Sequence, residues 1–278
     1  MAITTYDGLV AAYATAEIIT LSKATVVTQA AGGQSSLWRA TGWPIQGAIP
    51  TATGTTCITS LLGTYLANGQ TEAYTVATGL TAYLGTSNLS ESLAGGFMLY
   101  DRIMHNGGLV ANVTSLTAIT GFNVSGISDR LIATDYSNLH WYAEIYTDIG
   151  TTGGLVTVNY DSPTLTGQTC TVTIGGASPA NQDSRVFRIF PATGHPIKLI
   201  NSVRLTTSTG TAGSWGITAC RPIAYQTVPA LTQGGSDRDF AAIGMTVLAS
   251  VGSCLFHIVT TSTTSTGQVD GMIAVIKG

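Results

Sequence analysis

The segment from His140 to Tyr160, HWYAEIYTDIGTTGGLVTVNY, contains two runs of strand-forming residues on either side of a glycine-rich turn. In the first run the side chains alternate between two faces, Trp141, Ala143 and Ile145 on one and Tyr142, Glu144, Tyr146 and Asp148 on the other. This period of two is typical of a strand with one buried face. The second run, residues 155–160, consists almost entirely of strand formers, so the segment predicts a β-hairpin with its turn at 148–154.

Further strand patterns follow this segment. They lie at residues 169–174, 186–190, 198–206, 215–220 and 269–276. The third and fourth of these runs predict a strand pair around the loop of Thr, Ser and Gly at 207–214. Strands that recur about every ten residues with turn signals between them are typical of a sandwich or a barrel. We therefore expect an all-β protein, a jelly-roll-like β-sandwich built from two β units.

The N-terminal part of the chain adds one helix to this pattern. Thr4 or Thr5 can cap a short helix over residues 6–16, with Asp7 in the first turn, where a negative charge is favoured. Residues 18–29 then have an extended pattern.

A turn-rich segment at residues 119–136 is the best candidate for a boundary between the two β units. The predicted organisation is an N-terminal helix and arm at 1–21, a first β unit at 22–135 and a second at 136–278.

A long segment without clear periodicity, residues 30–56, contains two of the four tryptophans. Such segments in compact domains are usually functional or form interfaces, and Trp and Arg are enriched at binding hot spots. Trp38, Arg39 and Trp43 are therefore the candidate interface residues. The alternative is that both indoles fill the edge of the hydrophobic core, because large aromatic side chains dominate core burial too.

Two other segments have alternative interpretations. Asp101 and Arg102 interrupt an apolar run and would point to opposite faces of a strand, which we interpret as a ladder-end or interface feature rather than a site. Residues 241–259 contain no charge, and their 19 residues are long enough for a membrane span. However, Thr246, Ser250 and His257 are polar and no basic flank sets an orientation, which favours two strands joined by a tight turn.

The composition limits the classes of function. Only 9 % of the 278 residues are charged, against about 25 % in an average soluble protein, and 33 residues are glycine. So little charge is typical of a chain that forms many short strands joined by tight turns. It is also typical of a chain whose surface is largely covered by neighbouring subunits. The net charge of −3, without any run of Lys or Arg, argues against nucleic acid as a partner. The first residues lack the pattern of a secretory signal, so we expect synthesis in a cytoplasm.

Known catalytic and metal-binding motifs are absent. The sequence has no P-loop, no G-x-S-x-G elbow, no H-E-x-x-H and no dinucleotide fingerprint. Four widely spaced cysteines, Cys57, Cys170, Cys220 and Cys254, are expected to be buried free thiols. The four histidines, His105, His140, His195 and His257, lack the spacing of metal ligands. We therefore expect no enzyme activity, no cofactor and no metal.

Three segments together resemble a known group of proteins. The segment from Ala31 to Pro44 (AGGQSSLWRATGWP), the later LYDR ending at Arg102 and the ACRPI starting at Ala219 resemble virion structural proteins of tailed bacteriophages, and the opening MAITTYDGLVAAYA is also similar to theirs. The resemblance implies a β-sandwich protein on the outside of a capsid, of the decoration or minor capsid type. It carries over no site residues. The long helix and charged arm expected of a major capsid protein are missing.

Two functions follow as hypotheses. The first is a non-enzymatic structural protein that decorates or cements the outer capsid as a homo-oligomer, with a threefold cluster suited to local symmetry axes of the shell. Its partners would be itself and the major capsid protein, without nucleic acid or membrane, and it would be found in the virion after synthesis in the host cytoplasm. The alternative is a carbohydrate- or receptor-binding β module of a tail fibre or spike.

Overall fold

The computed structural model describes residues 3–24, 31–57, 80–92, 94–127, 130–131, 135–229, 236–244, 246–248, 253–262 and 267–278. Strands contain 49 % of these residues and helices 7 %. The all-β prediction is therefore confirmed. Among the described residues, none of the helices is both long and apolar enough to span a membrane.

The elements are α1 (Tyr6–Ala14), β1 (Glu17–Ala24), β2 (Gln34–Ser36), β3 (Thr41–Trp43), β4 (Thr55–Thr56), β5 (Ala82–Glu91), β6 (Gly95–His105), β7 (Leu109–Val110), β8 (Leu116–Ala118), η1 (Val124–Gly126), β9 (His140–Ile145), β10 (Gly154–Asp161), β11 (Gln168–Ile174), β12 (Arg185–Ile189), β13 (Leu199–Leu205), β14 (Ser214–Val228), β15 (Ser236–Arg238), α2 (Phe240–Ile243), β16 (Leu255–Thr261) and β17 (Gln268–Lys277). All strand pairings between these elements are antiparallel.

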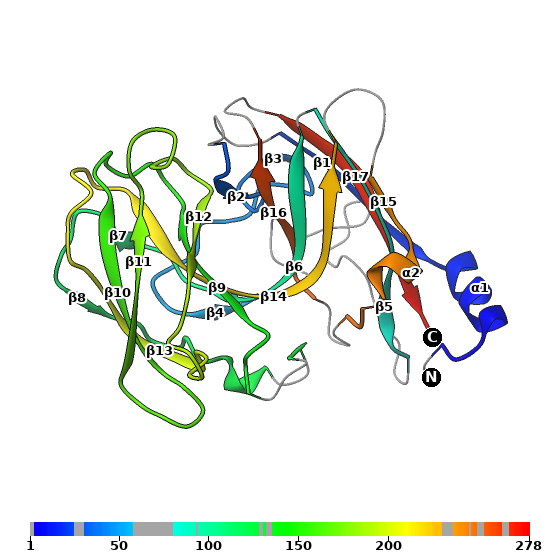
Figure 1. Ribbon diagram of the computed structural model, residues 1–278, viewed down its shortest axis with the longest axis horizontal. Coiled ribbons are helices and arrows are strands. Elements are labelled where there is room, and N and C mark those ends of the chain that lie inside the picture. Colours follow the sequence, from blue (N-terminus) through cyan, green and yellow to red (C-terminus); the bar gives the residue numbers. More distant parts are fainter. Residues whose placement is uncertain are drawn as a thin grey trace.

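Six strands close into a barrel at the centre of the molecule (Figure 1). Their order is β6–β16–β2–β12–β9–β14, and β14 pairs again with β6 to close the ring. A five-stranded sheet, β15–β5–β17–β1–β3, lies on one side of this barrel, and a four-stranded sheet, β11–β10–β13–β8, lies on the other. The arrangement is a closed barrel between two sheets, which differs from the two facing sheets of a simple jelly-roll sandwich.

Separate hydrophobic clusters join the barrel to each flanking sheet. On the four-stranded side, Trp141 and Ile217 of the barrel pack in one cluster with Val156 and Ile200. The cluster on the other side contains barrel residues such as Phe97 and side chains of β1, β5 and β17. The barrel strands therefore pack against the flanking sheets with their outer faces, while their inner faces line the barrel interior.

The predicted hairpin at 140–160 is wrong, although both of its strands exist. β9 pairs with β12 and β14 in the barrel, whereas β10 pairs with β11 and β13 in the four-stranded sheet. The intervening residues carry the chain from one sheet to the other. Ile149 is buried in the cluster between the two sheets, and a Cβ on Gly150 would lie 1.7 Å from the carbonyl oxygen of Thr209. The glycine is needed for this close backbone approach rather than for a hairpin turn.

The predicted pairing of 198–206 with 215–220 fails in the same way. β13 pairs with β10 and β8, and β14 pairs with β6, β7 and β9. The loop between them again connects two sheets. The strand patterns at 169–174, 186–190 and 269–276 are confirmed as β11, β12 and β17.

Strands from both sides of the predicted boundary at residue 135 share the same sheets. β17 pairs with β1 and β5, and β14 and β16 both pair with β6. The predicted division into units 22–135 and 136–278 therefore does not separate the sheets of the protein.

The N-terminal helix is confirmed as α1. The Thr5 hydroxyl accepts a hydrogen bond from the amide of Gly8 at 3.1 Å, as an N-cap residue does. Leu9 and Ala12 pack in a cluster with Tyr83 and Ile276 of the five-stranded sheet.

The predicted strand–turn–strand of 241–259 is correct only in its second half. β16 forms its last part, but Phe240–Ile243 is the short helix α2, whose N-cap Asp239 accepts from the amide of Ala242 at 2.9 Å. Residues 245 and 249–252, where the turn was expected, lie outside the described part of the chain.

Candidate functional site

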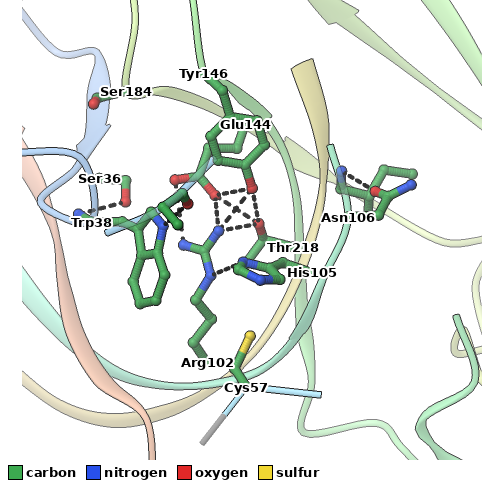
Figure 2. Close-up of polar contacts among 12 residues, drawn as sticks. Ser36, Trp38, Cys57, Arg102, His105, Asn106, Glu144, Tyr146, Ser184 and Thr218 are labelled. Carbon is green, nitrogen blue, oxygen red and sulfur yellow. Dashed lines mark hydrogen bonds and ion pairs between the residues drawn. The ribbon is translucent and has the colours of Figure 1, made fainter. Parts of the chain in front are cut away.

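The densest group of polar side chains lies inside the barrel and is centred on Arg102 of β6 (Figure 2). β6 places Asp101 and Arg102 on opposite faces, as predicted, and both side chains are 0 % exposed. Their interpretation as a ladder-end or interface feature is wrong. They are the two centres of a buried charged network that extends through the barrel wall.

The Arg102 guanidinium donates hydrogen bonds to four side chains. Its Nη2 atom donates to Glu144 Oε2 at 2.6 Å, to Tyr146 Oη at 2.8 Å and to Thr218 Oγ1 at 3.0 Å, while Nη1 reaches Glu144 Oε1 at 3.3 Å. Nε donates to His105 Nδ1 at 3.0 Å. The planar fork of the guanidinium therefore joins side chains of β6, β9 and β14 and the residue after β9.

Glu144 is equally well satisfied. Besides Arg102, the hydroxyls of Tyr146 and Thr218 donate to its Oε2 atom at 3.0 and 2.6 Å. Burial alone would raise the pKa of Glu144, but the charge and hydrogen bonds of Arg102, followed by Thr218, lower it below its ordinary value. The carboxylate thus stays ionised inside the barrel because its partners replace the water it has lost.

Aromatic rings complete the surroundings of Arg102. Its Cζ atom lies 4.5 Å from the centre of the Trp38 ring and 5.1 Å from that of Phe256. The His105 ring meets Trp38 edge to face with centroids 5.5 Å apart. A cation over the face of an indole is attracted by the ring quadrupole, and this attraction is strongest where water is excluded.

Cys57 and His105 provide the elements of a cysteine nucleophile next to this network. Burial by itself raises the pKa of Cys57, but a hydrogen bond with Cys254, electrostatic interaction and a hydrogen bond with the His105 ring, and the charge of Arg102 lower it overall. However, Cys57 is 0 % and His105 only 5 % exposed. Both side chains are therefore buried among the described residues, where they contribute to the packing of the barrel interior.

Asp101 organises the second centre, on the outer face of β6. Arg130 contacts both of its carboxylate oxygens, Arg221 Nη2 lies 3.6 Å from Oδ2, and the amide of Cys254 donates to Oδ1 at 2.9 Å. Arg130 also donates to the carbonyl oxygen of Arg102 at 2.8 Å. Burial acts to lower the pKa of Arg130, but the charge and the hydrogen bond of Asp101, together with smaller contributions from Cys254 and Cys57, raise it overall. One carboxylate of β6 therefore joins Arg130, the neighbouring strand β14 and the residue before β16.

The predicted interface residues occupy different environments. Trp38 is 1 % exposed, and its Nε1 atom donates to the carbonyl of Ala48 at 3.0 Å. A Cβ on Gly47 would lie 2.3 Å from the same indole. Trp38 is therefore a core residue of its own chain, as in the alternative interpretation that the indoles fill the hydrophobic core. Its ring covers Arg102 inside the barrel.

Arg39 and Trp43 lie nearer the surface. The Arg39 side chain is 16 % exposed, with Nε 3.9 Å from Asp183 Oδ2, and Trp43 is half-buried on the edge strand β3. Whether either residue contacts another subunit stays a prediction.

The four cysteines are free thiols. Cys57, Cys220 and Cys254 are buried as expected, and Cys170 is partly exposed. Within the described ranges, no three or more His, Cys, Asp or Glu side chains form a group that could hold a metal ion.

A second buried polar pair lies where the barrel meets the five-stranded sheet. Lys23 of β1 donates to the carbonyls of Leu37 and Ala40 at 3.0 and 3.3 Å, and burial lowers its pKa to about 7. Burial, and then the charge of Lys23, lower the pKa of His257 to about 3. The structure therefore holds this histidine neutral where an exposed histidine would be protonated.

This pair predicts a loss of stability in mild acid. Below about pH 6.5 His257 is protonated in the unfolded chain, whereas in the folded chain it stays neutral down to about pH 3. The free energy of unfolding should therefore fall with decreasing pH in this window, by about 1.4 kcal/mol for each pH unit from this residue. Denaturant unfolding between pH 7 and pH 4.5 should show a smaller fall in His257→Asn than in the wild type. Equal slopes in the two proteins would refute the assignment. His140, whose pKa burial lowers to about 4, accounts for part of the remaining slope.

The sequence contains one signal of the buried network. The polar residues of β9, Tyr142, Glu144 and Tyr146, share a face, and a solvent-facing side was the natural interpretation of that face. Their burial becomes visible only when β14 closes the barrel over them.

Comparison of the chain with models of protein families, with curated proteins and with solved structures gives no match in any of the three.

Proposed function

We propose that the protein is a non-enzymatic structural component of a bacteriophage particle, bound to the outer capsid as a homo-oligomer in contact with the major capsid protein. The observation that carries this proposal is the sealing of the reactive and charged side chains. Arg102, Glu144, Asp101 and Cys57 are at most 1 % exposed and are joined to neighbouring strands. Groups placed in this way stabilise a rigid β framework. Such a framework suits a protein that stays bound to a particle as a structural component.

The surface supports the same proposal. The chain has few charges, and three apolar side chains gather on the segment from β7 to β8, namely Val110, Val113 and Leu116, which are 43, 43 and 62 % exposed. The first two also line an apolar hollow of about 160 Å³. Exposed apolar groups that cluster in this way favour contact with another protein surface, and we assign this apolar segment to contact with a second copy.

A paired substitution tests that contact. Val113→Asp with Leu116→Asp should weaken self-association at least about tenfold, because two charges would have to lose water at the interface. Sedimentation velocity over a range of protein concentrations measures the effect. Leu165→Asp is the matched control, since Leu165 is also exposed, at 45 %, but belongs to the loop between β10 and β11. Equal weakening by the control, or an unchanged association of the double variant, would contradict the assigned contact.

The location on the particle needs a separate experiment. Purified virions should contain this chain at a copy number that matches a set of capsid symmetry axes, as measured by quantitative mass spectrometry. Shells that carry it should withstand a higher temperature than shells without it, because a protein that binds only the assembled shell stabilises it by mass action. Absence from washed virions would end the proposal.

A receptor- or carbohydrate-binding module of a tail fibre remains the second candidate. A pocket beside the exposed ring of Phe190, 71 % accessible, favours it. A handful of copies per particle, with the chain in the tail fraction, would support this alternative over capsid decoration.

A further inference from the structure

A surface pocket of about 400 Å³ lies between the edge strand β11 and the barrel strands β12 and β2. Its lining residues include Gln34, Thr173, Arg185, Arg188 and Phe190. The volume falls within the about 300–1,000 Å³ that is usual for small-molecule sites. The pocket is separate from the buried network around Arg102.

The charge of this pocket is one-sided. Among the residues that the structure describes, two arginines line it and none of the lining residues is acidic. Arg185 donates to the carbonyl of Pro179 at 3.0 Å and to the hydroxyl of Ser35, among its partners, and burial lowers its pKa. Arg188 is partly exposed and, within the described residues, forms no ion pair with a carboxylate. In a chain with a net charge of −3, this hollow is therefore a place where an anion gains free energy.

An aromatic platform adjoins the cation. The Cζ atom of Arg188 lies 5.2 Å from the centre of the Tyr142 ring and 5.7 Å from that of Phe190. These rings restrain the guanidinium, so less side-chain entropy is lost when it binds an anion. Phe190 leaves most of its own ring in solvent.

The combination selects the class of ligand. A phosphate site usually surrounds one point with several backbone amides or cations, whereas the described lining of this pocket offers one partly exposed guanidinium, that of Arg188. An exposed ring face attracts the positively polarised C–H groups of a sugar, and Gln34 and Thr173 add groups that hydrogen bond to hydroxyls. We propose that this pocket binds a carboxylate-bearing sugar of the hexuronate class, with the acid on Arg188 and the sugar ring on Phe190.

The test uses the purified full chain and three probes. Glucuronate, glucose and inorganic phosphate are titrated separately at constant ionic strength, and binding is followed by calorimetry and by chemical shifts of residues around the pocket. Glucuronate should bind at least about tenfold more tightly than glucose, the value of one charge-assisted hydrogen bond. Equal affinity for glucose would remove the role of Arg188. Phosphate binding as tight as that of glucuronate would replace the sugar site with a simple anion site.

Variants assign the two contacts. Arg188→Gln should weaken glucuronate binding about tenfold, and Phe190→Ser, at a position that is already solvent-exposed, about threefold or more. Arg204→Gln, an exposed arginine on the four-stranded sheet, is the charge-matched control and should change affinity less than about twofold. Equal weakening by the control would overturn the proposal in favour of a general charge effect. None of these results depends on where the protein sits on a particle, so this inference and the proposed function can fail independently.

Discussion

Glu144→Gln should lower the free energy of unfolding by about 3–5 kcal/mol, the usual cost of leaving one member of a buried ion pair without its partner. The substitution keeps the shape of the side chain but removes the charge that faces Arg102 at 2.6 Å. It also turns an amide N–H₂ or a weaker acceptor toward the donors of Tyr146 and Thr218. Denaturant unfolding followed by fluorescence and by far-UV circular dichroism measures the loss.

A matched pair on the surface provides the control. Glu17 and Lys277 are also 2.6 Å apart, but their side chains are 23 and 20 % exposed. Glu17→Gln should cost no more than about 1 kcal/mol, because water screens the pair and solvates the survivor. Similar losses for the two Gln variants would show that burial does not strengthen the Arg102–Glu144 pair.

A double replacement separates the pair from its surroundings. Arg102→Met with Glu144→Leu should be less destabilising than the sum of the two single changes, because no charge is then left alone in the barrel. Strict additivity in this double-mutant cycle would mean that the two side chains act independently, against the geometry.

Asp101→Asn should have an effect of similar size, about 3 kcal/mol or more. Asp101 is the carboxylate that lies between Arg130 and Arg221, and all three side chains are at most 3 % exposed. Its neutralisation leaves two buried guanidinium groups to repel each other at short range. It also weakens the acceptor for the amide of Cys254.

Two measurements identify this mechanism. Hydrogen exchange at the Cys254 amide should accelerate in Asp101→Asn more than exchange at amides of the four-stranded sheet. Arg130→Met introduced into Asp101→Asn should recover part of the lost stability by removing one of the two opposed cations. A loss below about 1 kcal/mol, or no recovery, would mean that Asp101 does not anchor the segments around β6.

The local patterns that proved correct depend on residues close together in the chain. Trp141, Ala143 and Ile145 do share a buried face, and Thr5 caps α1 through a bond to Gly8, three residues away. The opposite directions of Asp101 and Arg102 were also predictable, since successive side chains alternate along any strand. Backbone geometry imposes each of these features within a few residues.

Pairing between strands follows from different information. The glycine-rich residues after β9 satisfy the chemistry of a hairpin turn equally well whether the next strand returns to β9 or enters another sheet. Burial of Ile149 and the contact of Gly150 with Thr209 favour the second outcome, and that contact joins residues 59 positions apart. Periodicity in the sequence indicates which side chains share a face of a strand. It does not indicate which other strand pairs with that strand.

The buried network shows the same division. A sequence pattern places Glu144 on the polar face of a strand, and polar faces usually meet water. Here that face meets Arg102, 42 residues earlier, and Thr218, which is 116 residues after Arg102. Period-two alternation follows from local stereochemistry, which the order of residues contains directly. The burial of the charges depends on barrel closure by β6 and β14, a long-range event whose free energy is shared among all six strands.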